Sequence, residues 1–589
     1  MDQKAPLSPK YLILLSIIVG IISGVGAFAF YTLLELCTKF FFGLNHFKPP
    51  SAGGEIEVIP LDFNFGILPL FIIPAIGGLL SGLIVYGLAP EAEGHGTDAV
   101  IRAFHKMRGV IRARVPIVKM IASSITIGSG GSAGREGPII QIGAGFGSAL
   151  ASLLKLSDRD RRILVVCGMA GGIGSIFRSP LGGAIFGIEV LYKRDYEVEA
   201  MVPAFVSSIT AFVVFESILS CVSGCMQFGM IPIFKVPEVH IHSPFEFLIY
   251  ALVGLISGLI GLLYIKSFYT MHNLFRRLKI TPFVKPFIGG VLTGIIGFHL
   301  PQVLGMGYGF VQQAIYGELS LYTILLVVFG KIIATSFTIG SGGSGGVFAP
   351  SIVIGSMIGA FLGYFFNGII PDIVSQPEAY VLIGMSAFVA GVAKAPIAAI
   401  VMVVEMSGSY NLLPALTLAS AIAYYITGDK TIYIEQVPTR AESPAHRAEM
   451  QIDVLRNIKV GDAMIPAERV VTVKPDNTVF EVLNLIERTG HMGYPVLNNG
   501  ELVGIVTFED VEKVPVEKRR ATKVSEVMTR NLVVAYPDES LEDALIKLTS
   551  RDIGRLPVVD RKNERKLIGL ISRSDIMKAH AREISKLYS

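Results

Sequence analysis

The chain has 589 residues, of which 51% are hydrophobic, and its mean hydropathy is +0.59. Of its 51 basic and 47 acidic side chains, 46 in total lie between residues 441 and 589, which predicts a membrane domain followed by a soluble domain. The formal net charge of +4 is too small to indicate a nucleic-acid-binding protein.

The first apolar run, from Tyr11 to Leu36, is too long for the core of a signal peptide and predicts the first membrane helix. Further apolar stretches lie at about residues 65–88, 163–192, 199–220, 246–268, 286–300, 320–339, 350–370, 379–406 and 412–427. Several are shorter than the ~20 residues that a spanning helix needs, and glycine or proline interrupts many others, so we expect short, broken and tilted helices. The four cysteines are interpreted as buried packing residues: Cys37, Cys167, Cys221 and Cys225.

Two pairs of motifs divide the membrane region into related halves. GSGGSAGREGP at Gly128–Pro138 is matched by GSGGSGGVFAP at Gly340–Pro350, and the segment 168–192 matches the segment 384–408 without a gap. The glycines let backbone amides crowd together at a helix start, and each proline suits the first turn of a helix. Two helix N-termini directed at one point would form an anion site, and paired halves with interrupted helices are typical of transporters whose substrate binds between the repeats.

An acidic side chain lies at the first of these helix starts. Glu136 stands between Arg135 and Gly137, which are candidate anion-binding residues. The helix dipole stabilises a carboxylate there, and it would compete with a bound anion for the same amides. Protonation would release it, so Glu136 is a candidate gate and proton acceptor. The alternative interpretation is a buried helix cap or a salt bridge with Arg135.

The second half offers donors from the opposite side. The backbone N–H groups of Val347 and Phe348 precede the helix that opens at Pro350, and they are candidate anion ligands. Tyr433 follows the last apolar segment, where its phenol could donate to the same anion; the alternative is an interfacial tyrosine.

A linker at residues 434–457 precedes a second duplication. VGDAM at Val460–Met464 is answered by VSEVM at Val524–Met528, and each copy has the pattern strand, helix, strand, turn, strand, helix. Two small α/β modules that pair with one another are the expected result, at residues 458–516 and 522–582.

These motifs resemble the CLC family of chloride channels and chloride/proton exchangers. The strongest matches are GREGP at 134–138, FGIEV at 186–190, GVFAP at 346–350 and GMSAFVAGVAKAP at 384–396, and the C-terminal repeat resembles a tandem pair of CBS domains. The resemblance implies a multi-pass α-helical membrane protein with inverted repeats and broken helices, followed by an α/β CBS-domain pair. Residues 1–433 would form the anion-transport domain, with repeat halves at about 65–220 and 246–433.

The resemblance also implies a homodimer with a separate pathway and bound chloride in each subunit. It places the protein in the plasma membrane, with the N-terminus and the CBS domains cytoplasmic, and the basic clusters at residues 102–114 and 155–162 favour the same side. It casts Glu136 as the external gating glutamate and Tyr433 as the inner hydroxyl donor.

Two positions depart from the family pattern. The family commonly has GSGIP at the first helix start, whereas this chain has GHGTD, so His95 replaces a serine that contacts chloride. The imidazole could donate to the anion, or it could face away and leave the contact to backbone amides. Proton-coupled members usually carry a second glutamate where this chain has Val190, and valine cannot bind a proton. Val190 therefore favours a passive channel, with a chloride/proton antiporter that uses another proton route as the alternative.

Other classes of protein fit the sequence less well. A CBS-regulated cation transporter would need acidic oxygen ligands in the membrane, and the apolar segments offer few. No catalytic dyad, metal-ligand cluster or phosphate loop appears, so we expect neither an enzyme nor a metal site.

The CBS pair carries a hydroxyl residue three positions before an aspartate, at Thr507–Asp510 and at Ser572–Asp575. A carboxylate can accept both ribose hydroxyls, while the nearby hydroxyl and backbone N–H groups contact phosphate. The resemblance makes an adenine nucleotide (ATP, ADP or AMP) the expected regulatory ligand, and no cofactor is obligatory. The alternative is a purely structural dimerisation pair.

Overall fold

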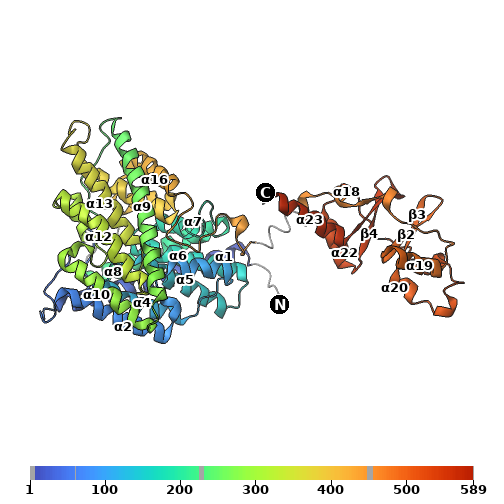
Figure 1. Ribbon diagram of the computed structural model, residues 1–589, viewed down its shortest axis with the longest axis horizontal. Coiled ribbons are helices and arrows are strands. Elements are labelled where there is room, and N and C mark those ends of the chain that lie inside the picture. Colours follow the sequence, from blue (N-terminus) through green and yellow to red (C-terminus); the bar gives the residue numbers. More distant parts are fainter. Residues whose placement is uncertain (1–6, 60–61, 225–230, 447–454, 588–589) are drawn as a thin grey trace. The chain divides into compact units, whose positions relative to one another are not determined.

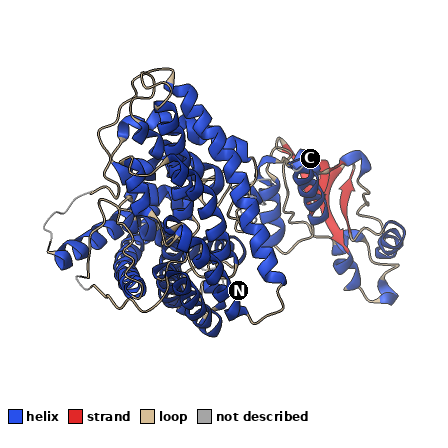
Figure 2. Ribbon diagram, turned by 60° about the vertical axis from the view of Figure 1, so that its left-hand side comes forward, coloured by secondary structure: helices blue, strands red, loops and turns tan. Residues whose placement is uncertain are grey.

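The computed structural model describes residues 7–59, 62–224, 231–446 and 455–587. The chain divides into two compact units, residues 1–445 and residues 446–589. Figure 1 shows the first unit as a stack of packed helices, and the strands of the second unit are coloured red in Figure 2.

The first unit consists of two successive halves. The first half contains α1 (Pro9–Gly43), α2 (Ile73–Leu88), α3 (Thr97–Lys106), α4 (Arg114–Gly128), α5 (Glu136–Leu153), α6 (Asp158–Ile176), α7 (Pro180–Glu189) and α8 (Met201–Ser223). The second half contains α9 (Glu246–Arg277), α10 (Lys285–His299), α11 (Tyr308–Ile315), α12 (Leu321–Gly340), α13 (Phe348–Asn367), α14 (Pro377–Ala393), α15 (Pro396–Ser407) and α16 (Leu413–Thr427). The two halves share an order of relative lengths, because each begins with its longest helix (α1, α9) and has its shortest helices at the third and seventh places (α3 and α7, α11 and α15).

Stretches long and apolar enough to cross a membrane occur in both halves. They are Pro9–Gly43, Leu70–Leu88, Val198–Ser223, Glu246–Arg277, Leu321–Gly340 and Phe348–Asn367, judged by length and composition. By contrast, α7 has 10 residues and α15 has 12, which is too short to span a bilayer alone. The expectation of short and broken helices is therefore confirmed.

The breaks before these short helices have a local cause. Arg178 and Lys394 adopt left-handed backbone conformations with φ of 52° and 55°, and each is followed two residues later by the proline that opens α7 or α15. Proline fixes a helical φ and lacks the N–H that the preceding helix would require, so the chain starts a new helix there.

Glycines bring the paired inner helices into backbone contact. A Cβ on Gly168 of α6 would lie 2.8 Å from the backbone nitrogen of Ala144 in α5, and a Cβ on Gly384 of α14 would lie 2.6 Å from that of Gly359 in α13. Any side chain at Gly168 or Gly384 would force these helices apart.

Carboxylates tie the two halves together by capping each other's helices. Glu189, at the end of α7, accepts hydrogen bonds from the N–H groups of Ile397 (3.2 Å) and Ala398 (2.8 Å) in the first turn of α15. Glu405, near the end of α15, accepts one from the Gly182 N–H (2.8 Å) in the first turn of α7 and one from the Ser179 hydroxyl (2.5 Å) just before it. Both acids lie at a helix N-terminus, where the dipole favours negative charge.

The expectation that the cysteines are buried packing residues is only partly met. Cys167 is buried and Cys37 is half-buried, but Cys221 is exposed. Cys221 lies near the end of α8, an apolar helix that buries only part of its surface, so the side chain falls on the outward face. Cys225 lies outside the described residues.

The second unit contains two similar sets of elements. The first set is α18 (Val460–Ala463), β1 (Ile465–Pro466), α19 (Val479–Thr489), β2 (Gly493–Asn498), β3 (Glu501–Thr507) and α20 (Phe508–Glu512). The second set is α21 (Val524–Val527), α22 (Leu541–Ser550), β4 (Arg555–Asp560), β5 (Asn563–Ser572) and α23 (Arg573–Leu587). Strands β2 and β3 pair antiparallel, and β1, β5 and β4 form a second sheet in that order. The two apolar cores are shared between the sets: Val524 and Met528 of the second set belong to the core around α19, β2 and β3, and Val460 of the first set belongs to the core around α22, β4 and β5.

Candidate functional site

The candidate site lies where three helix starts meet. Gly134 and Gly346 each donate their N–H to the other's carbonyl oxygen, at 2.7 Å and 2.6 Å, so the loops before α5 and α13 are joined back to back. The Gly345 N–H also donates to the Gly94 carbonyl (3.2 Å), in the loop before α3. A Cβ at Gly137 would overlap the carbonyl oxygen of His95, so only glycine permits this approach.

Glu136 crosses from one half of the unit to the other. It is fully buried at the first residue of α5, yet its Oε2 accepts the N–H of Ala349 (3.1 Å) in the first turn of α13. Its Oε1 accepts a hydrogen bond from the Tyr308 hydroxyl. The carboxylate therefore occupies the N-terminus of α13, which is the position where an anion is favoured.

Arg135 is directed away from this carboxylate. Its Nη1 lies 3.5 Å from Glu55 Oε1, and its guanidinium carbon lies 5.5 Å from the centre of the Tyr31 ring and 5.6 Å from that of Tyr308. The structure thus gives Arg135 an ion pair with Glu55 and cation–π contacts with both rings.

The other predicted ligands of the second half lie at the start of α13. Val347 is its N-cap residue and Phe348 its first residue, and the N–H groups of a first helical turn have no partner within the helix. The Phe348 ring packs against Phe177 and Phe186, with ring centres 5.7 Å and 5.4 Å away. This packing fixes the backbone at the site.

His95 and Tyr433 are far apart in the sequence, before α3 and after α16, but their side chains lie close together. Both side chains are buried, and their ring centres are 5.4 Å apart. His95 Nε2 lies 3.1 Å from Asp98 Oδ2, whereas its Nδ1 is buried and has no hydrogen-bond partner among the described residues. Within the part of the chain that the structure describes, one imidazole nitrogen of the histidine that packs against Tyr433 is therefore without a hydrogen-bond partner.

Val190 is buried at the end of α7; its N–H donates to the Phe186 carbonyl (3.0 Å), and its carbonyl oxygen accepts the Gln436 side-chain N–H (2.9 Å). The adjacent Glu189 is held by the α15 amides described above. No titratable group therefore stands at position 190.

Two buried lysines hold the loops that flank the site, and the sequence analysis did not identify them. Lys119 Nζ donates to the carbonyl oxygens of Ala92 (3.0 Å) and Gly94 (2.6 Å). In the second half, Lys331 Nζ donates to Gly305 (2.8 Å) in the corresponding loop. The signal was present in the sequence, because both lysines precede their glycine motif by the same distance.

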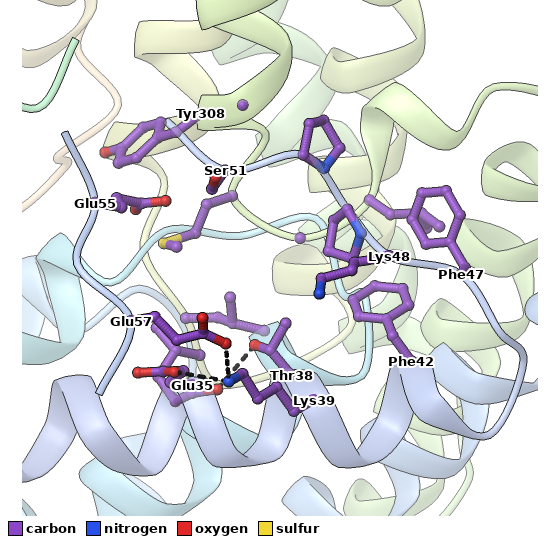
Figure 3. A pocket seen from close by; sticks show the side chains of 18 of the residues that line it. Glu35, Thr38, Lys39, Phe42, Phe47, Lys48, Ser51, Glu55, Glu57 and Tyr308 are labelled. Carbon is purple, nitrogen blue, oxygen red and sulfur yellow. Dashed lines mark hydrogen bonds and ion pairs between the residues drawn. The ribbon is translucent and has the colours of Figure 1, made fainter. Parts of the chain in front are cut away.

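A cavity of about 620 Å³ opens beside the site. Figure 3 shows it between the last turns of α1, the segment that follows α1, and Tyr308. Its cations are paired with acids: Lys39 Nζ contacts Glu57 and lies 3.2 Å from Glu35 Oε1, while Arg135 contacts Glu55.

The aspartates predicted to bind nucleotide act as helix caps. Asp510 Oδ2 accepts the N–H (2.9 Å) and hydroxyl (2.8 Å) of Thr507 at the start of α20, and Asp575 Oδ2 accepts those of Ser572 (3.0 Å and 2.6 Å) at the start of α23. The hydroxyl and carboxylate predicted to work together are thus adjacent in both modules.

No group of three or more His, Cys, Asp or Glu side chains that could hold a metal ion occurs in the described part of the chain.

Comparison with known proteins relates both units to characterised families. The family model "Voltage gated chloride channel" matches residues 77–428, and the model "CBS domain" matches residues 460–517 and 524–582. A putative chloride channel protein ClcB-like of Ralstonia nicotianae is 31% identical over 370 residues, which cover 62% of this chain and 84% of that protein. An H(+)/Cl(-) exchange transporter ClcA of Vibrio parahaemolyticus is 28% identical over 441 residues, or 72% of this chain and 89% of the relative.

The fold is also similar to a solved structure. The crystal structure of a slow cyanobacterial Cl-/H+ antiporter superimposes with a TM-score of 0.63 at 24% identity, covering 72% of this chain and 97% of that chain. The fold class expected from the sequence, a multi-pass helical membrane unit followed by a CBS-domain pair, is therefore confirmed.

Proposed function

Because the chain belongs to the voltage-gated chloride channel (CLC) family of anion transporters, we propose that it moves chloride through a site between its two halves and that Glu136 gates this site. The observation that carries the proposal is the hydrogen bond from the Ala349 N–H to the Glu136 carboxylate. A carboxylate and a chloride ion seek the same amides, so one excludes the other.

For chloride to enter the site, the Glu136 carboxylate must then leave the α13 amides. Protonation removes its charge and weakens its hold on the α13 amides. Chloride would then be bound by the backbone N–H groups at Gly137, Val347 and Phe348. The Tyr433 hydroxyl and the unpartnered His95 nitrogen would contact it from the other end. Arg135, paired with Glu55, would contribute positive potential rather than a direct bond.

We favour passive conduction over exchange because Val190 supplies no proton acceptor. A proton that crosses the apolar interior needs titratable groups or ordered water at each stage. The related proteins named as H(+)/Cl(-) exchange transporters keep the antiporter alternative open. A chloride gradient across proteoliposomes distinguishes the two: passive conduction leaves the external pH steady, whereas exchange drives protons at a fixed ratio to chloride.

The gate is tested by chloride efflux from proteoliposomes at a series of pH values. Wild-type flux should rise as the pH falls, and Glu136→Gln should give high flux with little pH dependence because the neutral amide cannot compete for the helix amides. Glu57→Gln, a carboxylate on the cavity rim, is the matched control and should keep the wild-type profile. An unchanged pH profile in Glu136→Gln would show that Glu136 is not the gate.

For the second unit we propose regulation by an adenine nucleotide, bound with Thr507, Asp510, Ser572 and Asp575. The support is the pairing of hydroxyl and carboxylate at equivalent helix starts in both modules. We further propose module boundaries at 458–516 and 522–582, a homodimeric assembly in the plasma membrane, and a cytoplasmic position for the N-terminus and the CBS pair.

A further inference from the structure

A tyrosine outside the predicted anion site contacts the gating carboxylate. Tyr308 is 2% exposed and begins α11, and its hydroxyl donates to Glu136 Oε1. Because the Ala349 N–H donates to Oε2, each carboxylate oxygen has its own donor, and the two donors come from different helices of the second half. The carboxylate is thus fixed in orientation as well as position.

The Tyr308 hydroxyl is itself held in place. The preceding Gly307 has a φ of 88°, in the left-handed region that favours glycine. Lys331 holds the carbonyl oxygens of Val303 and Gly305 in the same loop. The Tyr308 ring packs edge-on against Phe234, with ring centres 5.7 Å apart. Because the hydroxyl is already held in place, little conformational entropy is lost when it hydrogen-bonds to the carboxylate.

The first half has the same loop but a different side chain. Gly96, with a φ of 84°, precedes Thr97 at the start of α3, as Gly307 precedes Tyr308 at the start of α11, and Lys119 holds the loop as Lys331 does. Of these two equivalent residues, Tyr308 hydrogen-bonds to Glu136, whereas Thr97 forms no hydrogen bond to Glu136 among the described residues.

Tyr308 also separates Glu136 from the cavity. Tyr308, Glu55 and Arg135 line the cavity, and Glu136 does not. Figure 3 shows Tyr308 and Glu55 on the same side of it. An ion or proton that comes from the cavity therefore meets Tyr308 before the carboxylate.

The cavity and the end of the membrane unit lie at opposite ends of α1. The Leu7 N–H donates to Asp160 Oδ2 (3.3 Å) and Arg162 Nη1 donates to the Ala445 carbonyl (3.2 Å), which places the start of α1 near the last residue of the unit. From there α1 runs for 35 residues, about 50 Å, to Gly43, which lines the cavity. Tyr308 is thus on the side of the gate away from the chain's exit to the second unit.

We propose that Tyr308 is the positioning residue of the gate: its hydroxyl holds the Glu136 carboxylate on the α13 amides, so that opening from the cavity side requires this bond to break. The inference rests on the proposed gating role of Glu136.

A substitution at Tyr308 leaves the other charged or titratable side chains near the Glu136 carboxylate unchanged. Arg135 precedes Glu136 but faces Glu55, and Lys331 of α12 is bound to loop carbonyls. Tyr433 and His95 contact each other, with ring centres 5.4 Å apart, and neither forms a hydrogen bond to Glu136 in the described part of the chain. None of these is changed by a substitution at Tyr308.

The test compares Tyr308→Phe with Tyr364→Phe in proteoliposomes. Tyr364 lies in α13, and its hydroxyl donates to the carbonyls of Ala314 (2.9 Å) and Ile315 (3.2 Å) at the far end of α11. Tyr364→Phe therefore controls for the loss of a tyrosine hydroxyl bond between α11 and α13 that does not involve Glu136. Chloride efflux is measured against pH for both variants, for Glu136→Gln and for the double variant with Tyr308→Phe.

Tyr308→Phe should move the midpoint of the pH profile upward, because a less firmly held carboxylate leaves at a lower proton concentration. The loss of one charge-assisted hydrogen bond corresponds to about one to two pH units. Tyr364→Phe should keep the wild-type midpoint, and Tyr308→Phe should add nothing in the Glu136→Gln background. In calorimetry with chloride as the probe, Tyr308→Phe should bind chloride about tenfold more tightly, because the competing carboxylate is weaker.

Three results would overturn the inference. If the pH midpoint of Tyr308→Phe equals that of wild type, the Tyr308 hydrogen bond does not hold the gate. The proposed function still stands in that case, provided that the efflux of Glu136→Gln is insensitive to pH. If Tyr308→Phe changes chloride efflux by the same factor in wild type and in Glu136→Gln, Tyr308 acts through the fold rather than through the carboxylate. A wild-type pH profile in Glu136→Gln would overturn the gate and the inference together.

Discussion

The reciprocal carboxylate caps make a stability prediction that is separate from transport. Glu405 accepts a hydrogen bond from the Ser179 hydroxyl and two from the N–H groups of Leu181 (3.2 Å) and Gly182 (2.8 Å). Glu405→Gln keeps one acceptor oxygen and turns an NH₂ group toward a donor. At least one charge-assisted bond is lost, and the side chain loses its favourable interaction with the α7 dipole. Together these cost about 2–4 kcal/mol.

The assay is thermal unfolding of the purified protein in detergent. Glu405→Gln should lower the midpoint by several degrees, and Glu189→Gln, the equivalent cap on α15, should do the same. Glu378→Gln is the control, since Glu378 also lies in the first turn of a helix, α14, but has no such bonds among the described residues. If Glu405→Gln and Glu378→Gln unfold at the same temperature, the caps do not join the halves as we infer.

Three further outcomes are expected. Asp575→Asn should weaken binding of ATP, ADP or AMP to the full-length protein about 10- to 100-fold in calorimetry, because it loses the charge for ribose but keeps an oxygen for the Ser572 cap; equal affinity would exclude the proposed contact. Gly137→Ala should abolish chloride efflux, since its Cβ overlaps the His95 carbonyl, whereas Gly87→Ala, which meets nothing within 4 Å, should not; active Gly137→Ala would contradict the close approach. A chloride gradient should leave the external pH of wild-type proteoliposomes steady, and sustained uphill proton movement would replace the channel interpretation with exchange.

The sequence predicted the features that repeat as patterns of residue type. Glycine and proline at equivalent positions of the two halves indicated the broken helices, because these residues act through the backbone, whatever packs around them. The pattern was weaker for α4 and α5 (Arg114–Gly128 and Glu136–Leu153), which were not among the expected apolar stretches. Basic residues at the start of α4 and the glycines of α5 dilute their apolar signal, and packing against neighbouring helices stabilises them instead.

Contacts between the halves could not be obtained from residue types. Arg135 follows a glycine motif and precedes Glu136, so sequence alone allows a salt bridge between neighbours; the structure pairs it with Glu55, 80 residues earlier, because the start of α5 directs adjacent side chains to different sides. The same geometry sends Glu136 toward α13. Proximity in sequence says little about partners at a helix start, where successive side chains diverge by about 100°.

Tyr308 differs from its counterpart Thr97, although the residues around it are alike in the two halves. Aligning the halves identifies Gly96 with Gly307 and Lys119 with Lys331, since these residues serve the backbone and are therefore alike in both copies. In the proposed function, the side chains that face the ion differ between the copies, because the two ends of one pathway would face different solutions. The proposed gate needs this asymmetry, because a carboxylate from the first half can close the site only if the second half supplies donors for it. Ala349 and Tyr308 of the second half both donate hydrogen bonds to Glu136. Differences between repeat partners at helix starts are thus where function is best sought in a duplicated transporter.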